Sequence, residues 1–309
     1  MTANLKSYTS LRSGLQSRLV DVAGGIRNSL QDPGPRVAVM IERLAAVEST
    51  VAELLGHPLA GCHILEIGPG QLFPQMIYFS RRNRVTGIDL DVLAHGFRPG
   101  PYWQMLRCNG PMRLVKTLAR KTLRYDARYQ RLLARWLGMN KLPSLQCLQM
   151  DATEMRFREE SFDAVFSFSV FEHLPDPAKA LDEIRRVLRP GGVAYISIHL
   201  YTSDNGCHDP RLYGTGRAGL PLWPHLRPAH QHRVRPNAYL NKIRLPQWRD
   251  IFQAHMPGAR FISHIYDEDK ARAAAQTIKQ NGELIEYADE ELITTDFAAA
   301  WKNVTRRAR

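Results

Sequence analysis

Short apolar runs alternate with amphipathic segments along most of the chain. Apolar residues spaced by three or four predict helices over 3–30 and 36–55. Seven strands are predicted, at 62–67, 84–88, 145–149, 162–168, 193–199, 260–266 and 295–302. Four more helices are predicted, at 72–82, 177–188, 245–255 and 267–279. Nearly continuous apolar strands that alternate with helices are typical of parallel sheets. The pattern therefore predicts an α/β fold with a mostly parallel seven-stranded sheet and helices on both faces.

Two interruptions divide this pattern. Residues 1–58 are predicted to form an N-terminal helical cover, and residues 59–309 one domain. A segment at 92–144 interrupts that domain after the second strand, as a helical insertion. Residues 200–245 are rich in Pro, Gly, His and Arg and predict a long ordered loop region.

Two strand ends carry candidate chemistry. The first strand ends in Glu66-Ile67-Gly68-Pro69-Gly70, and the second ends at Asp89, 19 residues after Gly70. A strand that enters a glycine turn and then a helix presents backbone N–H groups at the carboxyl edge of the sheet. There Glu66 can accept a hydrogen bond from a ligand ammonium, and Asp89 can accept from two ribose hydroxyls. The pair predicts a nucleoside-binding crevice.

The order of several motifs resembles a known family. LEIGPGQ, GIDLD, QMDATEM, FDAVFSFSVFEHLPDP and LDEIRRVLRPGG resemble the class I S-adenosylmethionine-dependent methyltransferases, of the small-molecule or glycan type. The resemblance covers roughly residues 60–200 without the insertion, and its most specific part is the block from Ser161 to Gly192. It implies a Rossmann-like fold and S-adenosyl-L-methionine as cofactor.

The resemblance also implies which residues bind the cofactor. They are Glu66, Gly68, Gly70, Asp89, Leu90, Asp151, Ala152 and Ser167. The first three would line the methionine end, Asp89 would hold the ribose hydroxyls, Asp151 and Ala152 would approach the adenine, and Ser167 would lie under the methionine moiety. The chain departs from the family pattern at the third glycine of the turn, where Gln71-Leu72 stand, so the path of this loop is left open.

A nicotinamide site is the competing interpretation of the glycine turn. It requires a G-x-G-x-x-G turn, and Phe73 occupies the third glycine position in that register. A plain tight turn without a ligand is the remaining alternative. Cofactor binding is favoured over both.

Three histidines are candidate catalytic bases. Transfer of a methyl group to a hydroxyl is a direct displacement in which a proton must also be removed. His173 follows the fourth core strand, His199 ends the next strand, and His208 lies shortly after it. All three are predicted at the sheet edge where ligands bind.

The segment that follows is rich in further ligand-type residues: His199, Cys207, His208, Asp209, His225, His230 and His232. Their spacing matches no standard metal pattern, so we predict no metal site and a loop around the methyl acceptor. Within it Tyr201, Asp204, Asn205 or His208 would contact the acceptor. The alternative is a capped turn in which Ser203 and Asp204 bond to nearby backbone.

Charge is concentrated in the insertion. The net charge is +12, and ten Lys or Arg residues stand between Arg107 and Lys141 with one acidic residue. A basic amphipathic helix is predicted over 112–137, with Leu114, Leu118, Tyr125, Tyr129, Leu132 and Trp136 on one side and Arg113, Lys116, Arg120, Arg124, Arg128, Arg131 and Arg135 on another. Its basic face could be solvated, lie on an anionic membrane, or bind nucleic acid. Nucleic acid is disfavoured, because no Asn/Asp-Pro-Pro-aromatic run follows the fourth strand.

Composition limits the remaining possibilities. No apolar run is long enough to span a bilayer, and the first residues lack the layout of a secretory signal, so we expect a cytoplasmic protein with membrane association as a candidate. The four cysteines form no CxxC pair and predict neither disulfides nor a cysteine zinc site.

The predicted function is methylation of a small-molecule or glycan/lipid-linked acceptor, at oxygen. The alternatives are a non-catalytic cofactor-binding protein that acts as a peripheral membrane or scaffold protein, and a NAD(P)-dependent oxidoreductase. The acceptor and the oligomeric state are left open.

Overall fold

Seven strands form one sheet at the centre of the described chain. The computed structural model describes residues 32–93, 99–213 and 215–304. The strands are β1 (His63–Ile67), β2 (Arg84–Asp89), β3 (Gln146–Gln149), β4 (Phe162–Phe168), β5 (Leu188–His199), β6 (Arg260–His264) and β7 (Asp296–Lys302). Their order is β3-β2-β1-β4-β5-β7-β6, and β7 alone runs antiparallel to its neighbours. The predicted fold class is confirmed.

Helices cover both faces of this sheet. On one face lie α2 (Gly34–Leu55), α3 (Pro74–Phe79) and α6 (Tyr125–Trp136), packed on strand residues such as Ile64 and Phe166. On the other lie α7 (Pro177–Val187) and α8 (Leu245–His255), packed on Leu65 and Val165. Successive side chains of a strand point to opposite faces, so adjacent apolar residues such as Ile64 and Leu65 feed two different cores.

Most predicted elements are found within a few residues of their predicted bounds. The strand predicted at 193–199 is an exception, because β5 already begins at Leu188, and the β4–β5 register shifts between Phe162 and Ala164. The short helix α10 (Asp289–Ile293) was not predicted. The predicted helix at 3–30 lies outside the described residues.

The insertion folds as three helices rather than one. They are α4 (Pro99–Cys108), α5 (Pro111–Thr122) and α6. Arg124 takes a left-handed conformation, with φ of 52°, and this residue separates α5 from α6. The predicted continuous helix over 112–137 is therefore wrong. So is the predicted apolar face at two positions, since Leu118 is 43% exposed and Trp136 is 50% exposed.

Polar contacts join the insertion to the glycine turn. Gln71 Nε2 donates to Thr117 Oγ1 at 3.1 Å, and Arg120 Nη1 donates to Gln71 Oε1 at 3.0 Å. Arg120 also pairs with Asp126, at 2.6 Å, and that carboxylate is only 3% exposed. Arg120, which the sequence placed on the basic face of one helix, therefore bonds to neighbouring side chains instead of standing free on that face. Gln71, which stands in the turn where the family pattern has its third glycine, fixes this loop to α5.

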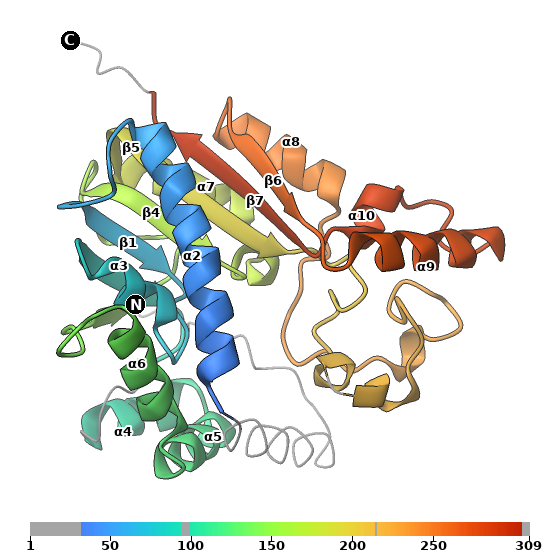
Figure 1. Ribbon diagram of the computed structural model, residues 1–309, viewed down its shortest axis with the longest axis horizontal. Helices are drawn as coiled ribbons and strands as arrows, with labels where there is room; N and C mark the ends of the chain where they lie inside the picture. The colour runs from blue at the N-terminus through green and yellow to red at the C-terminus, as the bar shows by residue number, and fades with distance from the viewer. Residues whose placement is uncertain (1–31, 94–98, 214, 305–309) are drawn as a thin grey trace.

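The segment 200–245 has its own small core. It contains the 3₁₀ turns η2 (Pro210–Tyr213), η3 (Thr215–Gly219) and η4 (Gln231–Arg233). Its buried Trp223 packs with residues of α9 (Glu268–Gln280) and α10, and Trp223 Nε1 donates to the Leu292 carbonyl at 3.2 Å. The prediction of an ordered loop is confirmed. Figure 1 shows this segment and the insertion on either side of the edge toward which β1, β4 and β5 point.

We expect Arg120→Ala to lower the free energy of unfolding by about 3 kcal/mol, because Asp126 would stay buried without its guanidinium partner. Breaking a buried pair costs about 3–5 kcal/mol, and the lower end applies because Arg120 is partly exposed. Urea denaturation measures this. Arg131→Ala is the control, since Arg131 is exposed and its Nε donates to the Ala127 carbonyl of its own helix; its change should stay within about 0.5 kcal/mol. Equal losses in the two variants would contradict the assignment.

Candidate functional site

The glycine turn after β1 passes close to the turn after β4. Gly68 has a φ of 70°, and a Cβ added there would lie 2.3 Å from Val170 Cγ2, so only glycine fits. Gly70 has a φ of 62°, and nothing lies within 4 Å of where its Cβ would be. The turn is thus packed on one side and leaves space above Gly70, as a ligand that approaches the backbone requires.

Glu66 at the end of β1 is a buried carboxyl that lacks a full set of partners. It is 1% exposed, and its Oε2 has no hydrogen-bond partner among the described residues. Burial raises the pKa of Glu66 well above its ordinary value. A buried oxygen of this kind is costly unless a donor reaches it. A ligand ammonium would supply both the donor and the compensating charge.

Asp89 ends β2 at the same edge of the sheet. Its Oδ1 accepts from the backbone N–H of Asp91 at 2.8 Å. Burial raises the pKa of Asp89 to about 6, although hydrogen bonds from the backbone of Asp91 and Gly70 act in the opposite direction. Leu90 follows directly, and its carbonyl accepts from Gln149 Nε2 at 3.2 Å. Asp89 therefore lies beside the Gly70 turn, where one ligand could reach both.

The other predicted cofactor residues shape the crevice. Asp151 Oδ1 accepts from both the backbone N–H and the hydroxyl of Thr153, at 2.8 Å each, so this oxygen holds a turn. Ala152 is buried. Ser167 is fully buried near the end of β4, and its hydroxyl donates to the Ile67 carbonyl at 3.4 Å. The contacts of Asp151 and Ser167 thus serve the local fold.

The three candidate histidines come together. His208 has its ring centroid 4.9 Å from that of His173 and 5.1 Å from that of His199. His173 belongs to the 3₁₀ turn η1 (Phe171–His173), and His199 ends β5. His199 Nδ1 lies 3.4 Å from Asp296 Oδ1, because the β5–β7 register places these two residues opposite each other.

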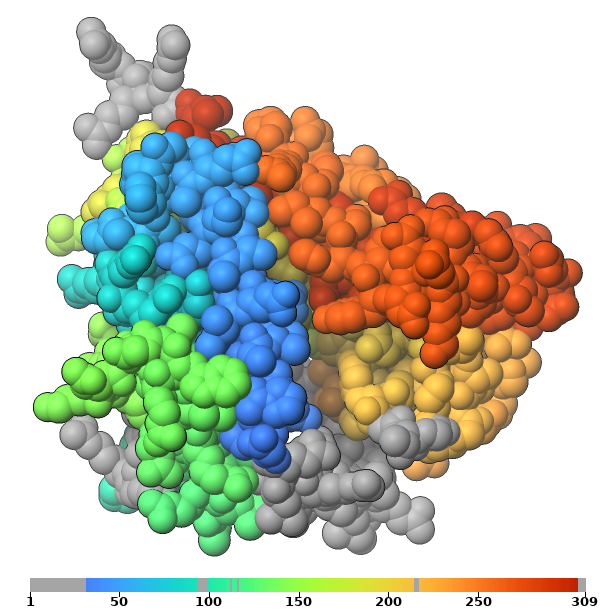
Figure 2. Space-filling model, viewed as in Figure 1, coloured from blue at the N-terminus to red at the C-terminus, as the bar shows by residue number. Residues whose placement is uncertain are grey.

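A cavity of about 430 Å³ adjoins the histidines. It is lined by Arg43, Ser169, His199, Asn205, His208, Tyr213, Tyr266, Thr295 and Asp296. Figure 2 shows the surface hollowed between α2 and the orange and gold surface of the later part of the chain. The volume lies in the range of small-molecule sites. Ser169 directly follows β4, so the cavity and the crevice meet at the same edge of the sheet.

Several other predicted site residues serve the local fold instead. Asp204 accepts from the Trp223 backbone at 2.6 Å and pairs with Arg217, which matches the capped-turn alternative. Asp209 pairs with Arg211 at 2.6 Å. His225 donates from Nε2 to the Tyr201 carbonyl at 2.6 Å. Cys207 is buried, and neither His230 nor His232 is among the cavity residues.

Sequence reasoning missed several contributors to the cavity, among them Arg43, Tyr213 and Asp296. Arg43 comes from α2, and its Nη2 lies 3.6 Å from Asp296 Oδ2. Tyr213 comes from η2 and Asp296 from the start of β7. A carboxylate at the start of the last strand was the one available signal, but its partner is 97 residues away in the chain.

Comparison with known proteins finds methyltransferases. A family profile described as a methyltransferase domain matches residues 111–196. An S-adenosylmethionine-dependent methyltransferase of Mycolicibacterium smegmatis, described as probable, is 29% identical over 149 residues, which are 48% of this chain and 42% of that protein. Residues 111–196 are thus similar to methyltransferase domains, and these matches together with the strand order support a class I S-adenosylmethionine-dependent methyltransferase.

A second curated relative matches a shorter stretch, and a solved structure matches most of the chain. An uncharacterized methyltransferase of Mycobacterium sp. (strain KMS) is 35% identical over 65 residues, 21% of this chain and 26% of that protein. Among solved structures, Haemonchus contortus phosphoethanolamine N-methyltransferase 2 in complex with S-adenosyl-L-methionine is 17% identical, with a TM-score of 0.45, over 84% of this chain and 53% of that chain. The chain thus spans less than half the length of the two curated relatives described here.

The crevice fits S-adenosylmethionine. The orphaned oxygen of Glu66 suits the amino group of the methionine part, and the open space above Gly70 admits the ligand close to the backbone. Asp89 can accept from the ribose hydroxyls. The amino-acid part and the ribose of one cofactor would therefore be bound by Glu66 and Asp89, which lie on either side of the glycine turn.

We expect the affinity for S-adenosylhomocysteine to increase with pH up to about pH 7. Asp89 accepts both ribose hydroxyls only when ionised, so affinity should fall about tenfold per pH unit below its pKa of about 6. The raised pKa of Glu66 acts in the same direction. Calorimetry from about pH 5 to about pH 8 measures this, and Asp89→Asn should flatten the part of the profile near pH 6. A flat wild-type profile would refute the assignment.

Two ligands can separate the roles of the two carboxylates. 5′-Methylthioadenosine carries the ribose of the cofactor but lacks its amino-acid part. Glu66→Gln should weaken the binding of S-adenosylhomocysteine about 10- to 100-fold, which is the contribution of a charged hydrogen bond. The affinity for methylthioadenosine should not change. Asp89→Asn should weaken both ligands. Equal effects of Glu66→Gln on the two ligands would show that Glu66 does not bind the ammonium.

Proposed function

We propose that this methyltransferase transfers the methyl group of S-adenosylmethionine to a hydroxyl oxygen of a small-molecule or glycan/lipid-linked acceptor. One observation carries the proposal: His199, paired with Asp296, lines the cavity beside the cofactor crevice, and its Nε2 has no partner among the described residues. This is the arrangement expected of a general base that receives a hydroxyl proton.

Asp296 determines which nitrogen of His199 can act. A carboxylate accepts only, so His199 Nδ1 carries the hydrogen and Nε2 carries the lone pair. Burial raises the pKa of Asp296, but the hydrogen bond of His199 and the charge of Arg43 outweigh it and hold this pKa below its ordinary value. Asp296 therefore stays ionised. It would both orient the imidazole and stabilise the imidazolium that forms.

The proposed reaction is a direct displacement at the methyl carbon. The cofactor supplies an electrophilic methyl group on a sulfonium. The acceptor oxygen forms a bond to the methyl carbon as the carbon–sulfur bond breaks, and the hydroxyl proton passes to His199 Nε2. The fixed position of the base on a strand end supports such a transfer, because proximity and orientation supply much of the rate enhancement in displacements of this kind.

The cavity supports a small acceptor. Its volume of about 430 Å³ suits one or two rings of a small ligand. Tyr213 and Tyr266, both largely exposed, contribute aromatic faces and hydroxyls, and Asn205 adds an amide. These groups can bind a polyhydroxylated ligand through many hydrogen bonds without a full charge.

The insertion surface supports an anionic membrane as a candidate partner of a lipid-linked acceptor. Trp103 is 63% exposed there, and Val115 and Trp136 are also exposed, with Arg131 and Arg135 nearby in α6. Apolar and basic side chains together favour binding at an anionic interface. No helix among the described residues has the length and apolarity to cross a bilayer.

His199→Asn should lower kcat about 10²- to 10⁴-fold, the usual contribution of a general base, while S-adenosylhomocysteine affinity stays unchanged. Transfer of labelled methyl groups to a panel of hydroxylated sugars and lipid-linked glycans measures this, with amine acceptors included. His255→Asn is the control, since His255 lies in α8 and pairs with Asp182. Turnover with amines alone, or full activity of His199→Asn, would exclude the proposed reaction.

A further inference from the structure

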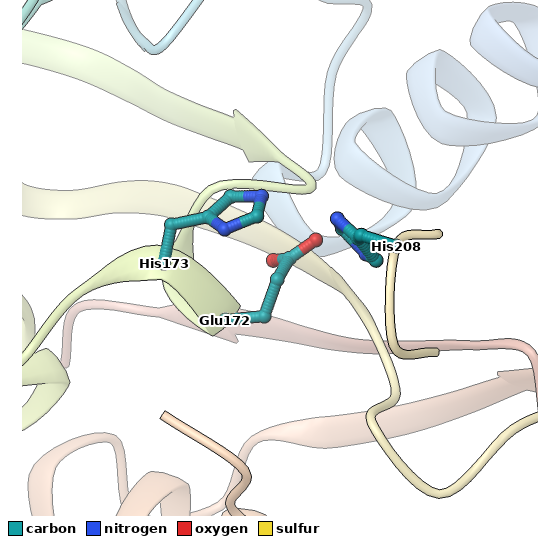
Figure 3. Close-up of side chains that lie close together, drawn as sticks. All are labelled: Glu172, His173 and His208. Carbon is teal, nitrogen blue, oxygen red and sulfur yellow. The ribbon is translucent and has the colours of Figure 1, made fainter. Parts of the chain in front are cut away.

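Glu172, His173 and His208 form a second cluster beside the cavity. One ligand atom of each lies within 4.8 Å of those of the other two. Figure 3 shows the carboxylate and the two imidazoles pointing toward one another, with Glu172 and His173 from η1 and His208 from the loop after β5. The methyl transfer proposed above assigns no role to these three side chains.

Two of the three groups have unpartnered atoms inside the cluster. Glu172 is 2% exposed, and neither its Oε2 nor His208 Nε2 has a hydrogen-bond partner among the described residues. Burial raises the pKa of Glu172 to about 8 and lowers that of His208 to about 3. Burial thus favours the neutral imidazole of His208, the form that binds a metal, and makes the carboxylate of Glu172 costly unless a cation compensates its charge. Unsatisfied buried polar atoms are rare in native proteins and call for an explanation.

The surrounding backbone orients these ligands. His173 Nδ1 donates to the Tyr239 carbonyl at 2.7 Å, which places the lone pair of that ring on Nε2. Glu172 Oε1 accepts from the backbone N–H of His199 at 3.3 Å. Asn241 braces η1, because its side chain donates to the Phe171 carbonyl at 2.8 Å. Metal-binding histidines usually have their other nitrogen fixed in this way.

We propose that Glu172, His173 and His208 bind a divalent transition-metal ion, with Zn²⁺ as the best match. Two neutral imidazoles and one carboxylate are a donor set that zinc and its neighbours prefer, whereas Mg²⁺ and Ca²⁺ prefer oxygen ligands alone. Three protein ligands leave a fourth tetrahedral position open. His208 also lines the cavity, so the ion would lie at the cavity wall. The prediction of no metal site, made from sequence spacing, is replaced by this proposal.

Metal binding to the full chain tests the proposal without any methyl donor. Protein stripped with a chelator is titrated with Co²⁺, whose visible absorption reports its coordination, and then with Zn²⁺ in competition. We expect one equivalent to bind with the absorption of a four-coordinate ion. Loss of a ligand should cost more than the roughly 10- to 100-fold typical of a residue that only orients one, so Glu172→Gln and His208→Asn should each weaken binding at least about 100-fold.

The variants are chosen so that folding does not obscure the result. Glu172→Gln keeps the shape of the side chain. His208 has a φ of 53°, a region that Asn tolerates well. His225→Asn is the matched control, because His225 is also buried but its Nε2 donates to the Tyr201 carbonyl. It should bind the ion as the wild type does.

Two results would overturn the proposal. One is a wild-type chain that binds no equivalent of Co²⁺ or Zn²⁺, which would assign the cluster to a neutral hydrogen-bonded network. The other is binding that both Glu172→Gln and His208→Asn retain, which would assign the ion to other histidines. S-adenosylhomocysteine affinity, measured in parallel, tests the cofactor site separately, so failure of the metal site and failure of the methyltransferase proposal are distinguishable.

Discussion

The parallel pairing of the central strands is the constraint on which the site depends. β1 pairs in parallel with both β2 and β4, and β4 pairs in parallel with β5. All four strands therefore end at one edge, although their ends lie far apart in the sequence. This brings Glu66, Asp89 and His199 to one edge, and the glycine turn between the first two removes the side chains that would otherwise fill it. The crevice and the cavity are two parts of the same edge.

Local sequence was sufficient to predict which residues meet where β1 and β2 end. Glu66, Gly68 and Gly70 lie within five residues of one another, and Asp89 ends the very next strand. The apolar runs show where each strand ends, and the rules for connecting parallel strands leave few possible arrangements of those ends. The partners of His199 could not be predicted in this way. Asp296 and Arg43 meet His199 only through the β5–β7 register and the packing of α2, and neither leaves a local pattern.

The insertion shows why an amphipathic pattern alone can mislead. The charges of α5 and α6 look like one solvated face, yet Arg120 bonds to Asp126 and Gln71, and Arg113 pairs with the buried Asp91. Such pairs depend on where a helix breaks, and the left-handed residue Arg124 has no β-branch, glycine or proline to mark it. The insertion is therefore a support of the cofactor loop as well as a candidate surface.

The histidines illustrate how one cluster can hold two chemistries. His199 has an anionic partner at Nδ1, which favours acceptance of a proton at Nε2. Among the described residues no carboxylate is hydrogen-bonded to His208. Burial together with two neighbouring imidazoles lowers its pKa to about 3, so it is a poor proton acceptor at neutral pH and a better metal ligand. Glu172 joins the two, because its Oε1 accepts from the backbone of His199 while its Oε2 faces the cluster. An ion that fixed Glu172 would thereby also fix the strand end that carries the proposed base.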